Sequence, residues 1–227
     1  SKSFIFGKLY NSRCVLQRFL RDHAEKGDYL DIHEGVKFLS LQLQKVVNCR
    51  DAGILRGLEG EAARTYYGVF DKLILEGKED FKFHGRSRRP PLDPTNALLS
   101  FLYTLLSHDC TSALETVGLD PQVGFLHKER PGRPSLALDL MEELRPYLVD
   151  RLALSLINNR QVDIKGFITK ESGGVIMTDE LRKTVITSWQ KRKQEEIIHP
   201  FLGEKIPIGL IPYAQAMLLA RHLRGDL

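Results

Sequence analysis

The 227-residue chain is poor in cysteine, and its three cysteines lack the spacing of a disulfide framework or of a metal site. Cys14, Cys49 and Cys110 lie far apart, their number is odd, and no CxxC pair occurs. Disulfide-stapled folds and zinc ribbons use closely spaced, usually even sets of cysteines, so both classes are excluded. We expect the three residues to be buried free thiols.

Long hydrophobic runs are also lacking, because no apolar stretch approaches the roughly 20 residues of a membrane-spanning helix. The start, Ser1-Lys-Ser-Phe-Ile-Phe-Gly7, lacks the apolar core of a signal peptide. Internal repeats and low-complexity tracts are absent as well. With 42% hydrophobic residues, the composition predicts a globular cytoplasmic protein large enough for one domain with a core of its own.

Apolar residues recur every three to four positions along most of the chain, which is the spacing of amphipathic helices. This pattern covers residues 4–23, 30–48, 51–75, 94–117, 135–158, 178–198 and 212–223. Residues 162–177 differ, since two short extended segments flank Glu171-Ser-Gly-Gly174, the composition of a β-hairpin. The sequence therefore predicts a mainly α fold with one short β-hairpin, and a helical domain over residues 1–227 that is truncated at both ends.

Glu59 interrupts the apolar face of the helix predicted over residues 51–75. At about 100° per residue it falls on the same side as an apolar set, whereas Glu61 points toward water. That set is Leu58, Ala62, Tyr66, Val69, Phe70 and Leu73. A carboxylate buried without a partner protonates, so a charged one there needs a cation. The cation is either an internal arginine, Arg56 or Arg64, or a metal ion.

A second group of candidate ligands lies downstream, where Pro134 and Ser135 suit the start of a helix. Asp139 and Glu142 are three residues apart and share a helix face, and His127 lies in the preceding loop. One imidazole with two or three carboxylates suits Mg²⁺ or Mn²⁺. The competing interpretation is a solvated acidic face, because Asp139, Glu142 and Glu143 lie opposite a leucine-rich stripe.

Basic residues gather in three places although the net charge is only +4. The clusters are Arg86-Ser-Arg-Arg89, residues 128–133 and residues 191–193. Each cluster alone is typical of a solvated surface. Two of them, however, flank the candidate metal ligands in the sequence, which favours binding of a polyanion next to a metal site.

Two segments carry a family resemblance: Gly57-Leu-Glu-Gly-Glu-Ala-Ala-Arg64, and Gly124-Phe-Leu-His127 followed by Leu138-Asp-Leu-Met-Glu-Glu-Leu-Arg-Pro146. Their order and separation resemble the CRISPR-associated adaptation integrase, an endonuclease of spacer acquisition. Further stretches, including residues 85–91, 96–103 and 199–203, resemble the same family, closest to its type I-C subgroup. The resemblance covers essentially the whole chain.

This resemblance implies that Glu59, His127 and Glu142 bind one divalent metal, Mg²⁺ or Mn²⁺, with Asp139 as a further acidic catalytic residue. Many relatives carry aspartate at the position of Glu142. The family's N-terminal β domain has no counterpart before Phe4, so the chain resembles the helical catalytic domain alone. The acidic face would then line a cleft, with Glu143 directed to solvent or paired with a neighbouring base.

The implied activity is metal-dependent DNA cleavage and transesterification of a DNA 3′-hydroxyl into the CRISPR repeat. The implied partners are double-stranded and branched DNA, a second copy in the full-length protein, and a small CRISPR-associated protein, with no membrane. The DNA-binding residues that we expect are Arg64, Arg86, Arg88, Arg89, Lys128, Arg130 and Arg133. We expect Tyr66, Tyr67, Tyr103 and Trp189 to pack in the core.

Two other functions remain open. The first is a non-catalytic DNA-binding or scaffold module of the adaptation complex, and the second is a metal phosphoesterase acting on nucleotides. Metal-dependent DNA cleavage distinguishes the integrase from the scaffold module. Competition between long DNA and nucleotides distinguishes the integrase from the nucleotide phosphoesterase.

Overall fold

The computed structural model describes residues 1–23, 27, 29–128 and 130–226, and these are mainly helical, as predicted. The first part contains α1 (Lys2–His23), α2 (Leu30–Asn48), α3 (Ala52–Gly68), the 3-10 turn η1 (Phe70–Leu73) and α4 (Pro94–Thr116). A nearly continuous helical rod follows, made of α5 (Ser135–Leu144), the π-helical segment η2 (Arg145–Asp150) and α6 (Arg151–Asn158). The last part contains η3 (Ile164–Gly166), β1 (Phe167–Thr169), β2 (Val175–Met177), α7 (Asp179–Gln194), β3 (Glu196–Ile198), β4 (Lys205–Pro207), η4 (Ile208–Leu210) and α8 (Ile211–Arg224).

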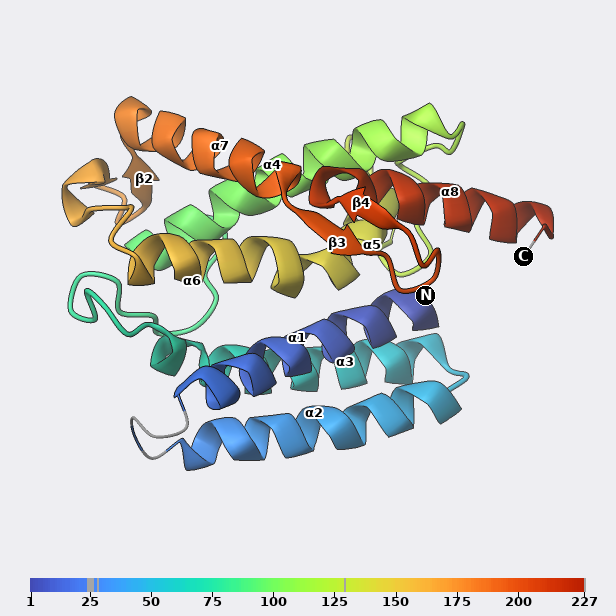
Figure 1. The fold of residues 1–227 in the computed structure, drawn as a ribbon, viewed down its shortest axis with the longest axis horizontal. Helices are drawn as coiled ribbons and strands as arrows, with labels where there is room; N and C mark the ends of the chain where they lie inside the picture. The colour runs from blue at the N-terminus through green and yellow to red at the C-terminus, as the bar shows by residue number, and fades with distance from the viewer. Residues whose placement is uncertain (24–26, 28, 129, 227) are drawn as a thin grey trace.

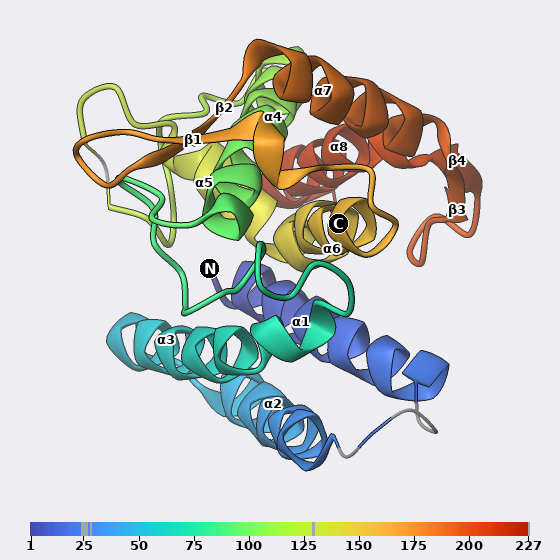
Figure 2. The same ribbon diagram turned by 90° about the vertical axis from the view of Figure 1, so that its left-hand side faces the viewer.

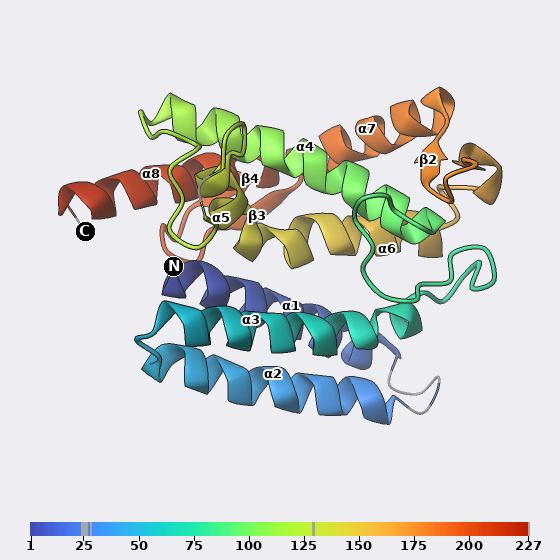
Figure 3. The same cartoon turned by 180° about the vertical axis from the view of Figure 1, so that it is seen from behind.

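The helices form two layers that meet along α1 (Figure 1). Helices α1, α2 and α3 make the lower layer, and α4 to α8 lie above them (Figures 1 and 2). Helix α1 packs on α2 and α3 within its own layer, and it also packs on α5 and η2 of the upper layer. Figure 3 shows the connection over residues 74–93 crossing from the lower layer to the upper one. The boundary between the layers therefore brings α1, α3 and α5 together.

Side-chain caps fix several helix starts at positions that the sequence marks. Asp51 accepts a hydrogen bond from the Ile54 amide at 2.8 Å, and Thr178 accepts one from the Leu181 amide at 3.2 Å. Asp93 caps α4 by accepting from the Asn96 amide at 2.7 Å, with proline at the next position. Each cap satisfies an amide that has no partner inside its helix, which stabilises the start by about 1 kcal/mol.

The core runs through both layers, and leucine is its commonest residue. Helix α4 contributes five fully buried leucines: Leu98, Leu99, Leu102, Leu106 and Leu114. Burial of one such side chain contributes roughly 1.5–3 kcal/mol relative to leaving it in water. Trp189 of α7 is buried as expected. This core holds α1, α3 and α5 in fixed positions, and they carry the candidate site.

The β-hairpin predicted over residues 162–177 is confirmed. Strands β1 and β2 pair antiparallel, with Phe167 opposite Met177 and Thr169 opposite Val175. The turn contains Gly173 at φ +79°, a left-handed conformation that favours glycine.

The helix expected over residues 178–198 is wrong at its end, because α7 stops at Gln194 and a second antiparallel pair follows. Strand β3 pairs with β4, with Glu196 opposite Pro207 and Ile198 opposite Lys205. His199 is buried in the turn between them, where its amide donates to the Glu204 carbonyl at 2.8 Å. Pro200 lacks the amide hydrogen that a continuing helix would need, so the chain turns here.

The cysteine expectation holds only in part. All three thiols are free, but only Cys110 is buried, whereas Cys14 and Cys49 are partly exposed. Cys14 lies on α1, and Cys49 directly follows α2. Across the described helices, none combines the length and the apolar character required to cross a membrane.

Candidate active site

Asp139 organises the loop that carries His127. Its carboxylate is fully buried and accepts hydrogen bonds from the amides of Phe125 at 2.6 Å, Leu126 at 2.8 Å and His127 at 3.0 Å. The same carboxylate lies 2.6 Å from Nδ1 of His127. A carboxylate beside Nδ1 favours the tautomer that carries hydrogen on that nitrogen, so the Nε2 lone pair is free to bind a cation.

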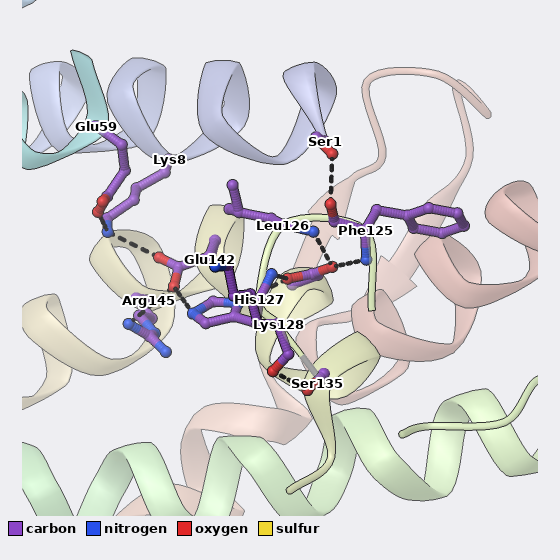
Figure 4. Close-up of polar contacts among 11 residues, drawn as sticks. Ser1, Lys8, Glu59, Phe125, Leu126, His127, Lys128, Ser135, Glu142 and Arg145 are labelled. Atoms are coloured by element: carbon purple, nitrogen blue, oxygen red, sulfur yellow. Dashed lines mark hydrogen bonds and ion pairs between the residues drawn. The ribbon is translucent and has the colours of Figure 1, made fainter. Parts of the chain in front are cut away.

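Glu142 lies one helical turn beyond Asp139 and faces the free side of the His127 ring (Figure 4). Its Oε1 atom is 3.5 Å from Nε2 of His127 and 3.0 Å from Nη1 of Arg145. Its Oε2 atom forms an ion pair with Nζ of Lys8 at 2.8 Å. Imidazole, guanidinium and ammonium groups therefore surround one buried carboxylate.

Lys8 is the residue that joins Glu59 to the rest of the site. Its Nζ atom contacts the carboxylates of both Glu59 and Glu142, and its side chain is only 10% exposed (Figure 4). Glu59 is 27% exposed and partly buried, as its place on the apolar stripe of α3 indicates. The internal cation is thus a lysine from α1, and the expectation of Arg56 or Arg64 is wrong because both point to solvent.

The surrounding cations keep Glu142 ionised. Burial alone would raise the pKa of Glu142, but the charges of Arg145 and Lys8 outweigh it and lower that pKa to about 2. Burial would likewise lower the pKa of Lys8, yet Glu142 and Glu59 together raise it. The site therefore contains a charged carboxylate and a charged ammonium at neutral pH.

The interpretation of Asp139, Glu142 and Glu143 as a solvated acidic face is wrong. Asp139 and Glu142 are buried because α5 is packed between α1, α4 and α8, which cover its polar side as well as its apolar stripe. Glu143 is not directed to solvent either, since its Oε1 atom accepts from Nε2 of Gln215 at 2.6 Å. Burial raises the pKa of Glu143 to about 7 against the effect of that hydrogen bond.

The donor set fits a divalent cation, although Lys8 now lies between the two carboxylates. Within the ranges that the structure describes, no three His, Cys, Asp or Glu side chains are drawn together closely enough to hold a metal. However, Nε2 of His127 faces Oε1 of Glu142 at 3.5 Å, while Lys8 contacts Oε2. An imidazole nitrogen and a carboxylate oxygen that face each other are a donor pair that Mg²⁺ or Mn²⁺ accepts.

A buried tyrosine network extends from Arg145 into the core. The guanidinium groups of Arg145 and Arg86 lie over the Tyr103 ring, 5.3 Å and 5.1 Å from its centroid. The Tyr103 hydroxyl donates to Asp150 and lies 2.8 Å from the Tyr67 hydroxyl. The expectation that these tyrosines pack in the core holds fully for Tyr66, whereas Tyr67 and Tyr103 are partly buried and are joined through their hydroxyls. The Tyr103 ring also contacts the Arg145 guanidinium that pairs with Glu142.

The predicted DNA-binding residues fall into two groups. Most are exposed: Arg64, Arg88, Arg89, Lys128 and Arg130. Arg133 is half-buried, and Arg86 is engaged inside the protein, donating to Asn96 Oδ1 at 2.6 Å and to Ser100 Oγ at 3.0 Å. Asn96 is itself buried. Arg86 thus has a structural role, and the exposed residues remain candidates for DNA contact.

Comparison with known proteins defines the family. A family model described as CRISPR associated protein Cas1 matches residues 1–191. The chain belongs to the Cas1 family. It is 61% identical over 230 residues to CRISPR-associated endonuclease Cas1 2 of Rhodospirillum rubrum, an alignment that covers all of this chain and 67% of that relative. The chain spans about two thirds of the length of the Cas1 relatives that it matches at more than half identity.

Two solved structures share the fold of this Cas1 chain. A casposase bound to its integration product matches with a TM-score of 0.82 and 27% identity, over 100% of this chain and 60% of the casposase. A Cas6-RT-Cas1–Cas2 complex matches with a TM-score of 0.83 and 26% identity, over 99% of this chain and 23% of that one. The mainly helical architecture is therefore that of Cas1 proteins.

Proposed function

We propose that the protein is a metal-dependent DNA endonuclease and integrase of CRISPR spacer acquisition, in which Glu59, His127 and Glu142 hold one Mg²⁺ or Mn²⁺. The observation that carries the proposal is the pairing of His127 Nε2 with the ionised Glu142 carboxylate at 3.5 Å, inside a fold shared with a casposase bound to its integration product. When bound, the metal would supply a Lewis acid for a DNA phosphodiester.

The protein's own groups prepare the site for phosphate chemistry. Asp139 holds the His127 ring and its loop, so that the Nε2 lone pair stays directed at Glu142. Arg145 is held by Glu142 at 3.0 Å and by the Tyr103 ring, which leaves a fixed positive charge beside the site. Fixed cations stabilise the charge that develops on a phosphate in the transition state. Water as the nucleophile gives cleavage, and a DNA 3′-hydroxyl gives strand transfer.

The proposed substrates and partners follow from the family and its structural neighbours. Double-stranded and branched DNA would contact Arg64, Arg88, Arg89, Lys128, Arg130 and Arg133 through backbone phosphates. A casposase bound to its integration product and a Cas6-RT-Cas1–Cas2 complex are among the structural neighbours, and they support DNA and a small CRISPR-associated protein as proposed partners. We further propose a type I-C-like protein of the cytoplasm, with residues 1–227 as the helical catalytic domain and a homodimer as the full-length form.

The test is Mn²⁺-dependent cleavage and strand joining on branched and double-stranded DNA. We expect Glu59→Gln, His127→Ala and Glu142→Gln each to lower the rate by at least 10²-fold at matched thermal stability. Glu61→Gln is the control, since Glu61 lies two residues from Glu59 but is exposed. Equal rates in Glu61→Gln and Glu142→Gln would refute the metal-ligand assignment, and competition by nucleotides rather than by long DNA would indicate a nucleotide phosphoesterase.

One observation favours a second candidate, a non-catalytic DNA-binding scaffold. The Lys8 ammonium already neutralises Glu59 and Glu142, as an internal ion pair in a purely structural site would. Isothermal titration with Mn²⁺ separates the two functions. Binding that is lost in Glu142→Gln supports the enzyme, whereas retained DNA binding with no Mn²⁺ binding supports the scaffold.

A further inference from the structure

A cleft that shares no residue with the candidate active site lies between α1, α6 and α7. Its walls carry four basic side chains: Arg18 from α1, Arg151 from α6, and Lys191 and Arg192 from α7. In Figures 1 and 2, α6 lies between α7 on one side and α1 on the other. Three separate helices therefore direct positive charge at one concavity.

The carboxylates near this cleft do not balance its cations. Arg192 pairs with Glu195 and Arg18 lies 3.3 Å from Asp22, whereas Arg151 forms no ion pair with any residue that the structure describes. The Nε atom of Arg192 is buried and has no hydrogen-bond partner among the described residues. Burial lowers the pKa of Arg151, and the charges of Arg18 and Arg192 lower it further. Such crowding of guanidinium groups is unfavourable unless an anion lies between them.

The aromatic ring of Tyr147 holds two of these guanidinium groups in place. Arg151 and Arg192 both lie over the ring, 5.1 Å and 5.7 Å from its centroid. Stacking on a ring restricts an arginine side chain and leaves N–H groups in the plane of the guanidinium group free to donate. Arg192 donates one of its N–H groups to Glu195, and its other N–H groups are not used by this pair. The guanidinium groups of Arg151 and Arg192 are therefore positioned before a ligand binds, which lowers the entropic cost of binding.

We propose that the α1–α6–α7 cleft binds a phosphate group. Arginine forks match the oxygens of a phosphate in bidentate geometry, and hydroxyls of Ser155, Thr187 and Ser188 line the same cleft as further donors. The phosphate belongs either to a nucleic-acid backbone or to a free phosphate or nucleotide, and both share this chemistry. The inference goes beyond the proposed function because it needs neither the metal nor any residue of the candidate active site.

The first test uses inorganic phosphate and the 227-residue chain without metal, so that its result is independent of catalysis. We expect phosphate to raise the melting temperature and to shift the Nε–Hε NMR signals of Arg151 and Arg192. Arg151→Gln and Arg192→Gln should each weaken phosphate binding at least tenfold. Arg182→Gln is the matched control, since Arg182 lies on α7 and pairs with Asp179 outside the cleft.

The second arm identifies the source of the phosphate. If Arg151→Gln binds single-stranded DNA more weakly, the phosphate belongs to a nucleic-acid backbone. In that case the slope of log affinity against log salt concentration should also fall by about 0.7 for each phosphate contact removed. Unchanged DNA affinity with tenfold weaker nucleotide binding assigns a free phosphate compound. The proposal is overturned if wild-type NMR signals do not move with phosphate, or if Arg151→Gln and Arg182→Gln bind phosphate equally. The NMR measurement needs no variant, so a variant that fails to fold leaves the proposal testable.

Discussion

The ammonium nitrogen of Lys8 lies 2.8 Å from Oε2 of Glu142 and also contacts Glu59, so a residue of α1 bridges carboxylates of α3 and α5. This bridge lies between the two carboxylates among the three proposed metal ligands. A divalent ion that binds both carboxylates must therefore displace the ammonium group from them. Metal binding and the Lys8 ion pairs are competing ways to neutralise the same charge.

The first prediction concerns Lys8→Met, which keeps the length of the side chain and removes its charge. Without metal, we expect the free energy of unfolding to fall by about 3 kcal/mol, because Glu142 loses one of its two cationic partners. Mn²⁺ should raise the melting temperature of this variant more than that of the wild type. Thermal unfolding with and without Mn²⁺ measures both effects.

The control for this prediction is Lys72→Met, which breaks an exposed ion pair with Asp31 and should cost less than about 1 kcal/mol. An identical response of Lys8→Met and the wild type to Mn²⁺ would show that the ammonium group and the metal do not share a position.

The second prediction concerns Asp139→Asn. The amide side chain cannot accept from three backbone amides and Nδ1 of His127 at once, so we expect the loop to loosen and the ring to lose its orientation. Mn²⁺ affinity should fall 10–100-fold, as is typical when the partner of a metal-binding histidine is removed. Asp120→Asn is the control, since Asp120 accepts from an exposed amide of the same loop. Equal Mn²⁺ affinity in both variants would argue against a positioning role for Asp139.

The third prediction is a pH dependence of stability that originates at Asp150. Burial raises the pKa of Asp150 to about 6 from 3.8, despite the hydrogen bond from Tyr103. The native state therefore holds this proton more tightly than the unfolded state, and stability falls as the pH rises from about 4 to 6. The shift corresponds to about 3 kcal/mol as an upper value.

Urea unfolding between pH 4 and 8 tests this prediction through the difference between Asp150→Asn and the wild type. We expect the wild type to gain stability relative to the variant as the pH falls from 6 to 4. Glu143 titrates in both proteins, so its contribution cancels in the difference. A difference that stays constant across this range would show that Asp150 does not have a raised pKa.

The fourth prediction separates two neighbouring arginines. Arg88 is exposed, so Arg88→Gln should leave the melting temperature unchanged and reduce the salt slope of double-stranded DNA binding by about 0.9 if it contacts one phosphate. Arg86→Gln should instead destabilise the fold by about 2 kcal/mol, because Asn96 and Ser100 lose their donor. Salt-dependent DNA titrations and thermal unfolding measure these effects. An unchanged salt slope in Arg88→Gln would remove this residue from the DNA-binding set.

The helices could be predicted from the sequence because their apolar periodicity is long and regular. The second strand pair could not, because β3 and β4 contain three residues each and β3 follows α7 directly. Three residues are too few to distinguish period 2 from period 3.6. Only the turn chemistry of Pro200 and Gly203 marks this place in the sequence.

The sequence also indicates which residues of the site belong together, but not how their charges are paired. The same argument that singles out Glu59 applies to Lys8, which lies on the buried stripe of α1 with Phe4, Ile5 and Leu9. Its partner could not be predicted, because the contact joins residues 51 positions apart across two helices. The burial of Glu142 depends in the same way on tertiary packing, which covers a helix face that its own sequence pattern leaves polar.

The π-helical segment Arg145–Asp150 sets the rotational phase between the two ends of one rod. Helix α5 on one side presents Glu142 to His127, and helix α6 on the other side begins with Arg151 of the basic cleft. If the same six residues formed a regular α-helix, α6 would be turned by about 100° relative to α5, because a π-helical turn contains about one residue more than an α-helical turn. Arg151 would then rotate away from Tyr147 and Arg192 while Glu142 kept its partners. The wider π-helical turn therefore sets a fixed angle between α5 and α6. Because of this angle, one continuous rod contributes Glu142 to the candidate active site and Arg151 to the basic cleft.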